Sequence, residues 1–128
     1  MLPGLTGQSE MIVGEGDLVR RLGKIDMDVL ATPRLVQLME EAAVQTIQEC
    51  ILPEQLSLGT QVKIKHLSPT PIGMKVIARA LLKEINGSRL FFLIDAYDEV
   101  EKVAEGEHER VLVSKERFLQ KVNRKRAG

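Results

Sequence analysis

The feature that most constrains the fold of this chain is one long helical pattern that begins at Thr32 and ends near Ile51. Thr32 followed by Pro33 is a helix start signal, because a threonine hydroxyl can accept a hydrogen bond from an unpaired helix amide and proline suits the first turn. Good helix formers follow, and Pro53 ends the pattern. We therefore expect a helix over about 32–51 with Thr32 as its N-cap.

One broad face of this helix is apolar when its residues are placed at about 100° per step. The apolar face consists of Leu38, Met39, Ala42, Ala43, Thr46, Ile47 and Cys50. Glu41 falls among the glutamines opposite and is expected to be solvated. Glu40 falls on the shoulder of the apolar face, where a carboxylate needs a partner. Glu40 is therefore a candidate site residue, although a helix-edge carboxylate that reaches solvent or an arginine would fit the same pattern.

The pattern changes from helical to alternating after Pro53. Ser57–His66 places Val62, Ile64 and His66 on one face of a strand. Further strands are expected over Met74–Ile85, Leu90–Tyr97 and Val103–Val113, with a short first strand at Ser9–Gly14, a hairpin turn at Asn86-Gly87, and a basic tail from Lys115 that is partly helical or frayed. One long helix followed by four successive strands predicts an α+β fold, with an antiparallel sheet wrapped on the helix.

Size and composition indicate one cytoplasmic globular domain over residues 1–128. Lysine plus arginine and aspartate plus glutamate both number 18, so no net charge attracts the protein to nucleic acid or to a membrane. The apolar runs are too short for a membrane span, and the start lacks the features of a signal peptide. The lone Cys50 excludes an internal disulfide and a multi-cysteine zinc site and is expected to lie in the core.

His66 shares a strand face with Val62 and Ile64 and should therefore lie in or at the lip of the core. A hydrogen-bonded core histidine is the simpler interpretation. A carboxylate and an imidazole close together where helix and sheet meet would suit general-base activation of water, which makes Glu40 and His66 a candidate pair. His108 and Arg110 are interpreted as structural or interface groups, because the two histidines lack metal-ligand spacing.

Several short motifs together resemble the hotdog-fold thioesterases of the fluoroacetyl-CoA thioesterase type. They are Ala31-Thr32-Pro33 with Leu38-Met39-Glu40, Ser57-Leu58-Gly59-Thr60, His66 with Thr70-Pro71 and Gly73, and Glu105-Gly106 with His108-Glu109-Arg110 and Phe118. The likeness covers about residues 9–122. It implies a long helix wrapped by an antiparallel sheet, and a homodimer that binds acyl-CoA at the subunit interface. A single helix covers only one face of such a sheet, which also favours pairing with another copy, in a dimer or a higher homo-oligomer.

The resemblance implies catalytic roles for Thr32, Glu40 and His66, and a substrate-binding role for Gly59. Glu40 and His66 would activate water or an acyl acceptor, Thr32 would donate a hydrogen bond or act as nucleophile, and the Gly59 amide would stabilise the oxyanion. The implied enzyme is an acyl-CoA thioesterase without metal or redox cofactor. Residues 23–30 contain no aromatic side chain, unlike the fluoroacetate-specific member, so we expect a short or medium acyl group. The alternatives are a non-catalytic acyl-CoA binder, an enoyl-CoA hydratase and a structural oligomerisation domain.

Overall fold

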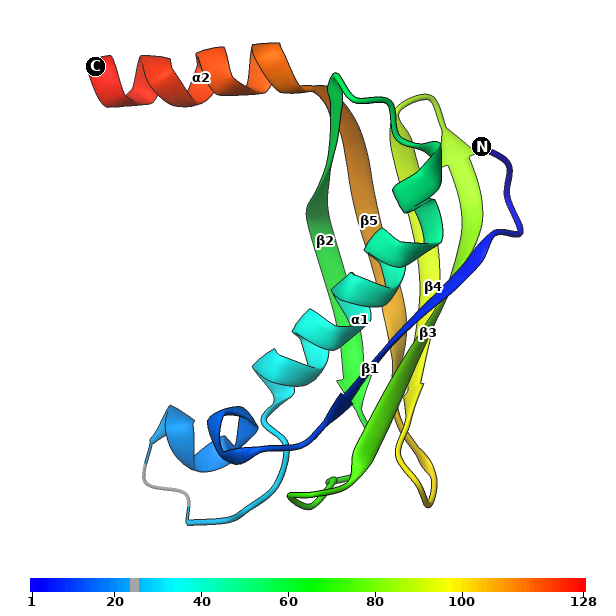
Figure 1. Ribbon diagram of the computed structural model, residues 1–128, viewed down its shortest axis with the longest axis vertical. Coiled ribbons are helices and arrows are strands. Elements are labelled where there is room, and N and C mark those ends of the chain that lie inside the picture. Colours follow the sequence, from blue (N-terminus) through cyan, green and yellow to red (C-terminus); the bar gives the residue numbers. More distant parts are fainter. Residues whose placement is uncertain (24–25) are drawn as a thin grey trace.

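The protein consists of one long helix packed on a five-stranded antiparallel sheet, as the sequence predicts. The computed structural model describes residues 1–23 and 26–128. The strands are β1 (Thr6–Ile12), β2 (Gln55–His66), β3 (Lys75–Asn86), β4 (Arg89–Tyr97) and β5 (Lys102–Ser114); the helices are α1 (Thr32–Ile47) and α2 (Lys115–Ala127), with short 3-10 segments at Glu15–Asp17, Val19–Leu22 and Gln48–Cys50. Figure 1 shows α1 lying across one face of the sheet and α2 projecting away past β2.

The strand order is β1-β3-β4-β5-β2, and every neighbouring pair is antiparallel. β1 and β2 are therefore the two edges of the sheet. The predicted hairpin between β3 and β4 is present, but its turn residues are Gly87 and Ser88, because Asn86 still pairs with Arg89 in the ladder. Of the two turn residues, only Gly87 has a positive φ, 63°. A positive φ at the first of two hairpin residues favours glycine at that position.

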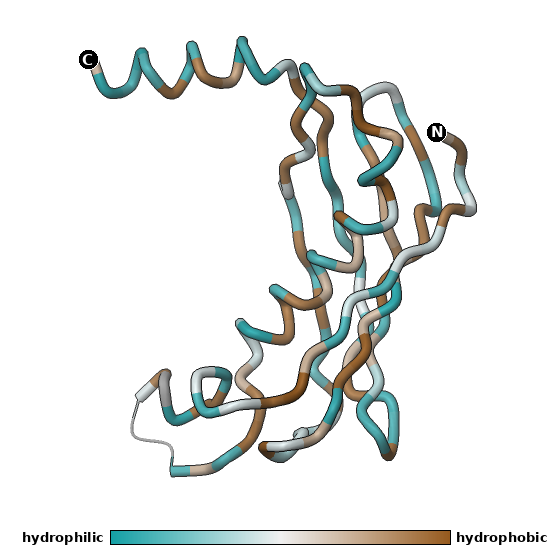
Figure 2. The backbone as a smooth tube through the Cα atoms, viewed as in Figure 1, coloured by the Kyte–Doolittle hydropathy of each residue, from teal (hydrophilic) through white to brown (hydrophobic). Residues whose placement is uncertain are grey.

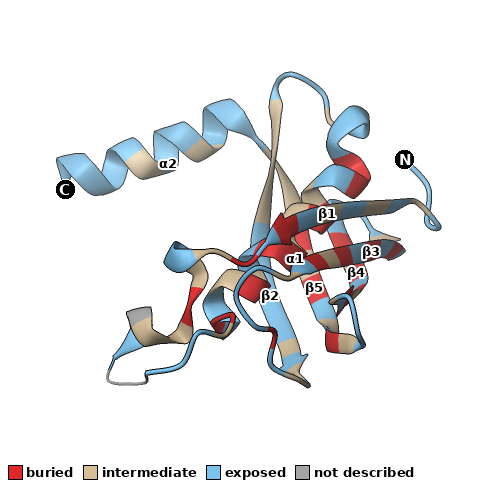
Figure 3. Cartoon of the chain, turned by 60° about the horizontal axis from the view of Figure 1, so that its bottom comes forward, coloured by how far each residue is buried: buried red, intermediate tan, exposed pale blue. Residues whose placement is uncertain are grey.

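The core lies between α1 and the inner face of the sheet, where Figure 3 shows the buried residues concentrated. The buried residues of α1 are Leu35, Leu38, Met39, Ala42, Ala43, Thr46 and Ile47. Figure 2 shows the corresponding apolar colouring along α1 and the central strands. The expectation that Cys50 belongs to the core is wrong, since it is exposed. The α-helix ends at Ile47 and tightens into a 3-10 turn, which changes the rotation per residue and moves Cys50 off the apolar face.

The start of α1 also differs from the prediction, because Ala31 rather than Thr32 is the N-cap and no side-chain cap is formed. The carbonyl of Ala31 accepts hydrogen bonds from the amides of Arg34 and Leu35. Thr32 is thus the first helical residue, and its hydroxyl is available for another partner. β1 begins three residues earlier than expected, at Thr6, and pairs along its whole length with β3.

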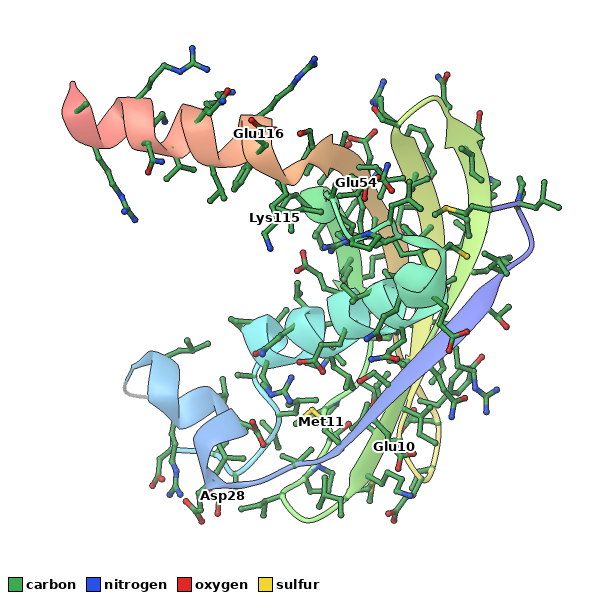
Figure 4. All side chains as sticks on the ribbon, turned by 45° about the horizontal axis from the view of Figure 1, so that its top comes forward. Glu10, Met11, Asp28, Glu54, Lys115 and Glu116 are labelled. Carbon is green, nitrogen blue, oxygen red and sulfur yellow. The ribbon has the colours of Figure 1, made fainter. Side chains whose placement is uncertain are left out.

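The basic tail is helical rather than frayed. Ser114 caps α2 by accepting a hydrogen bond from the amide of Arg117, and the Lys115 amide donates to the carbonyl of Glu54 at 2.9 Å. Figure 4 shows Glu54 and Lys115 close together where α2 leaves the sheet. Beyond that point no residue of α2 is buried. Among the described residues, no helix is long and apolar enough to cross a membrane.

Candidate active site

Thr32 and His66 form the first part of the candidate site. Thr32 Oγ1 lies 2.8 Å from Nδ1 of His66, within hydrogen-bonding distance. The Thr32 hydroxyl, which the sequence predicted to cap the helix, is therefore hydrogen-bonded to an imidazole at the end of β2. When a hydroxyl is hydrogen-bonded to an imidazole, the imidazole can act as a base that activates the hydroxyl as a nucleophile, or the pair can hold a water molecule for attack.

Backbone hydrogen bonds around the start of α1 bring these two side chains together. The amide of Leu30 donates to the carbonyl of Thr70 at 2.8 Å, which ties the residues before α1 to the loop after β2. The buried Thr70 in turn donates its hydroxyl to Asp98 in the β4–β5 turn. Burial alone would raise the pKa of Asp98, but hydrogen bonds from the Val100 and Glu101 amides and from Thr70 lower it. The loop is thus anchored on both sides.

His66 is half-buried, and this burial lowers its pKa below the usual 6.5, with a backbone interaction at Ser68 acting in the opposite direction. The imidazole is therefore neutral at pH 7 and able to accept a proton. Its other nitrogen, Nε2, is buried and has no hydrogen-bond partner among the described residues. A buried nitrogen of this kind normally has a partner, so the protomer leaves one position beside His66 unfilled.

Glu40 and Gly59 form the second part of the candidate site. A Cβ added to Gly59 would lie 3.1 Å from Glu40 Oε1, 3.1 Å from Cε1 of His108 and 3.4 Å from Nη1 of Arg110. Glu40 is half-buried on the shoulder of α1, as predicted. The absence of a side chain at Gly59 leaves an open space between a carboxylate, an imidazole and a guanidinium group.

The backbone N–H of Gly59 lies in the plane of the sheet and points away from β5, towards the open side of the edge strand β2. The Leu112 amide donates to Ser88 on the β4 side, whereas the Lys115 amide donates to Glu54 on the β2 side. Because N–H directions alternate along an antiparallel strand, Arg110 also points its amide towards β4. Arg110 is paired with Gly59 in the β2–β5 ladder. Because the Arg110 amide points towards β4, the two residues form a pair that exchanges no backbone hydrogen bonds. The N–H of Gly59 therefore also points away from its pairing partner, outward from β2.

His108 and Arg110 are buried beside Glu40, with only 3% and 7% of their surfaces exposed. Nδ1 of His108 lies 2.8 Å from the carbonyl of Gln61, and Nε2 lies 3.1 Å from Nη1 of Arg110. A carbonyl only accepts and a guanidinium only donates, so these partners assign a neutral His108 with its proton on Nδ1. Burial lowers the pKa of His108 and favours the same neutral form, although the Gln61 carbonyl and Glu40 act in the opposite direction.

The expected pairing of Glu40 with His66 is not formed within one protomer. Thr32 and Glu40 are separated by about 12 Å of helix rise, and Gly59 and His66 by about 23 Å of extended strand. The imidazole beside Glu40 is that of His108. The sequence did not assign His108 and Arg110 a place next to Glu40. The available signal was that both fall on one face of their strand; in the structure this face points inward, and Arg110 is paired with Gly59.

A hollow of about 920 Å³ lies on the outer face of the sheet. Its lining includes Lys63, Arg79, Leu93 and Asp95, and none of the candidate site residues. The candidate residues instead occupy the inner face and the β2 edge.

The chain resembles known proteins in both sequence and structure. A family model described as fluoroacetyl-CoA-specific thioesterase matches residues 13–116. The fluoroacetyl-CoA thioesterase of Streptantibioticus cattleyicolor is 37% identical over 98 residues, which cover 77% of this chain and 70% of that protein.

Several solved structures are also similar to this chain. A crystal structure of a point mutant of the fluoroacetyl-CoA-specific thioesterase FlK superposes with a TM-score of 0.90 at 32% identity, covering 98% of this chain and 97% of that chain. A Thermus thermophilus hypothetical protein, described as a thioesterase superfamily member, gives 0.92 at 26% identity, covering 98% and 93%. A hot-dog-like protein from Thermanaerovibrio acidaminovorans gives 0.88 at 25% identity, covering 98% and 93%. The fold is thus the expected hotdog fold, and the chain belongs to the fluoroacetyl-CoA thioesterase family.

Proposed function

We propose that this protein hydrolyses an acyl-CoA thioester with a short or medium acyl group, releasing the free acid and coenzyme A. The observation that carries this proposal is the hydroxyl–imidazole pair of Thr32 and His66, at 2.8 Å, in a chain of this family. A related thioesterase mutant was solved in complex with acetyl-CoA, and that chain is 31% identical to this one. The proposed reaction uses water and needs neither a metal nor a redox cofactor.

The proposed active site is shared by two copies of the chain in a homodimer. β2 is an edge strand in which no residue is buried, and long unpaired edge strands are rarely left open in soluble proteins. α1 packs chiefly on β1 and β3, which leaves Val62 on the inward face of β2 with 38% of its surface exposed. α2 extends beyond the β2 edge in Figures 1 and 3, so a copy paired along β2 would lie against α2.

Two-fold pairing along β2 would bring the separate parts of the site towards each other. Two β2 strands related by such an axis are antiparallel, so the His66 end of one lies towards the Gln55 end of the other. Thr32 and His66 of one subunit would then approach Glu40 and the outward amide of Gly59 in the partner subunit. The unfilled position beside His66 Nε2 supports this arrangement, since Glu40 of the partner subunit would be a suitable acceptor.

The proposed chemistry follows from the groups in this shared site. His66 accepts the proton of the attacking O–H group, which belongs to Thr32 or to a water molecule that Thr32 holds. Glu40 of the partner subunit accepts a hydrogen bond from His66 Nε2 and stabilises the positive charge that forms on the imidazole. The thioester oxygen becomes negative as the new C–O bond forms, and the Gly59 amide donates a hydrogen bond to it. The C–S bond then breaks, and His66 returns the proton to the coenzyme A sulfur. If Thr32 is the attacking group, a water molecule that gives its proton to His66 then attacks acyl-Thr32, the ester C–O bond breaks, and the proton returns to Thr32 as the free acid leaves. An acyl-Thr32 intermediate trapped at low temperature distinguishes attack by Thr32 from attack by water.

The acyl group is proposed from the segment before α1. Residues 23–30 contain no Phe, Tyr or Trp that could cover a very small substrate, and of these residues 24–25 lie outside the part of the chain that the structure describes. A site without an aromatic cover accommodates more than one acyl length. The proposed substrates therefore include fluoroacetyl-CoA together with other short and medium acyl-CoA thioesters.

A panel of acyl-CoA thioesters assayed with a thiol-detecting reagent tests the proposal. The parent should release thiol, and the Glu40→Ala and His66→Ala variants should be slowed by at least about 100-fold, the usual contribution of an acid–base group. Glu41→Ala is the matched control, because that neighbouring carboxylate contacts Ser9 and Arg34 instead of the site. Equal rates for parent, Glu40→Ala and His66→Ala would refute the site. Tight binding of acyl-CoA without turnover by the parent would indicate a non-catalytic binder.

A further inference from the structure

We infer that His108 and Arg110 are positioning residues that hold the backbone on both sides of Gly59 and thereby aim its amide at the substrate carbonyl oxygen. This inference rests on the proposed function, because it concerns the oxyanion site of that reaction. It assigns a specific task to two buried polar residues that take no direct part in the chemistry described above.

The chain around Gly59 needs such support because β2 is irregular there. The β2–β5 register shifts between Gly59 and Gln61, so Thr60 is an extra residue in a bulge. A bulge interrupts the ladder and leaves the local backbone with fewer hydrogen bonds to fix its direction. β2 is also the sheet edge, with no described strand on its other side. An amide that must point at one atom therefore lies in the least constrained part of the strand.

Arg110 holds the backbone before the bulge. Its Nε donates to Ser57 Oγ at 2.9 Å, and its Nη2 donates to the carbonyl of Ser57 at 2.9 Å. The third nitrogen, Nη1, donates to Nε2 of His108. All three nitrogens of the planar guanidinium are thus used, which sets both the position and the plane of the group. The chain is fixed two residues before Gly59.

His108 holds the backbone after the bulge. Its Nδ1–H donates to the carbonyl of Gln61, two residues beyond Gly59, while its Nε2 accepts from Arg110. Only the neutral imidazole can do both, and burial favours that form. Phe92 packs beside the imidazole, with ring centroids 6.0 Å apart. The resulting His108–Arg110 clamp joins the two ends of the bulge through a rigid, buried pair of side chains.

The clamp also contributes a cation close to Glu40. Burial lowers the pKa of Arg110, while nearby Glu40 raises it, and an arginine side chain remains charged in proteins. Glu40 Oε1 and Arg110 Nη1 lie 3.1 and 3.4 Å from the position that a Cβ on Gly59 would occupy. The guanidinium therefore places a positive charge near the Glu40 carboxylate at the Gly59 backbone.

Kinetics of acyl-CoA hydrolysis by clamp variants test this inference. His108→Leu and Arg110→Met should lower kcat by about tenfold to a hundredfold with little change in KM, because a misplaced oxyanion donor weakens binding of the transition state and not of the substrate. His108→Gln should recover most of kcat, since its amide keeps one donor and one acceptor. Ser57→Ala removes a single acceptor from Arg110 and gives a milder variant that folds if Arg110→Met does not.

Thr60→Val is the matched control within the same bulge. The Thr60 hydroxyl bonds to Glu109 on the outer face, so its loss changes the bulge without touching the clamp and should leave kcat unchanged. The amide resonance of Gly59, measured by NMR without substrate, should shift in His108→Leu and return towards the parent value in His108→Gln.

Two results overturn the inference and are distinguishable from each other. If the parent hydrolyses acyl-CoA and His108→Leu does so with the parent's kcat, or if Thr60→Val is slowed equally, the clamp has no specific role and the proposed function stands. If the parent releases no thiol from any acyl-CoA, the proposed function fails and the role of the clamp in it fails as well.

Discussion

Replacement of Gly59 by alanine is predicted to impair catalysis while leaving the protein folded. The added Cβ would lie 3.1 Å from Glu40 Oε1 and from His108 Cε1, so these neighbours must move by a few tenths of an ångström. His108 is buried and held at both ring nitrogens, whereas Glu40 is half-buried at the end of a flexible side chain. The carboxylate is therefore expected to give way, and the substitution displaces the group on which the proposed chemistry depends.

The expected change in stability is small because two effects oppose each other. Gly59 does not have a positive φ, so alanine fits its backbone and restricts the unfolded chain, which stabilises the protein by about 0.4–1 kcal/mol. Crowding at the new methyl group costs about 1–3 kcal/mol, with the lower end expected where a flexible side chain can move aside. The free energy of unfolding should therefore fall by no more than about 1–2 kcal/mol.

The expected loss of activity is separate from this change in stability. A displacement of about 1 Å in a reacting group costs about 100-fold in rate, so a shift of a few tenths of an ångström should lower kcat/KM by about tenfold. Tenfold corresponds to about 1.4 kcal/mol of transition-state stabilisation. The measurement is kcat/KM for the best acyl-CoA of the panel, alongside urea unfolding of the same preparations.

Two other glycines provide matched controls. A Cβ on Gly16 would meet nothing within 4 Å and its φ is not positive, so Gly16→Ala should raise stability by about 0.4–1 kcal/mol and leave the rate unchanged. A Cβ on Gly7 would lie 2.5 Å from the backbone nitrogen of Thr46, so Gly7→Ala should lower stability without touching the site. The reasoning is refuted if Gly59→Ala keeps the parent's kcat/KM, or if it loses activity only in proportion to its unfolded fraction, as Gly7→Ala should.

Four further predictions concern the same site and its assembly. Thr32→Val should lower kcat by about 100-fold or more, whereas Thr32→Ser should retain much of it, because serine keeps the hydroxyl bonded to His66. Burial lowers the pKa of His66, and the acid limb of kcat/KM should follow protonation of this imidazole; a kcat/KM that does not fall at acid pH would contradict this. The pKa of His108 is lowered too, so the unfolded chain binds more protons below pH 6.5, and the urea midpoint should fall as pH drops through that region. Val62→Asp should convert a dimer to monomer in light scattering with unchanged circular dichroism, since it places a charge on the inward face of the β2 edge.

Periodicity alone predicts most of the fold of this chain. Leu38, Met39 and Ala42 fall on one helix face because burial imposes the 3.6-residue period, and alternation in β2–β5 reflects the two-residue period of a sheet. Prediction fails where local geometry departs from these periods. Cys50 is exposed because the last turn tightens to 3-10, and the β3–β4 turn shifts by one residue because Asn86 remains paired in the ladder.

The site is less predictable than the fold because it depends on contacts between distant segments. Thr32 is a good N-cap by residue type, and only the tertiary fold shows that its hydroxyl is bonded to His66 instead. The position of Glu40 on the helix shoulder follows from placing residues at about 100° per step, but its imidazole neighbour does not, since both His66 and His108 lie on inward strand faces. Which imidazole lies beside Glu40 is decided by strand order, and strand order is not contained in any local pattern.

Mixing two inactive variants gives a direct test of whether the site is shared. In a Glu40→Ala homodimer and in a His66→Ala homodimer, every site lacks one essential group. A mixed dimer has one site with both groups intact, made from His66 of the first variant and Glu40 of the second, and one site that lacks both. After unfolding and refolding an equal mixture, half of the dimers are mixed, so about a quarter of the parent's kcat per subunit should return. Sites contained within single subunits would show no recovery at any mixing ratio. Because each variant keeps Thr32, Gly59 and the β2 edge, recovery would arise from Glu40 and His66 meeting across the subunits, and its absence would place the site within one chain.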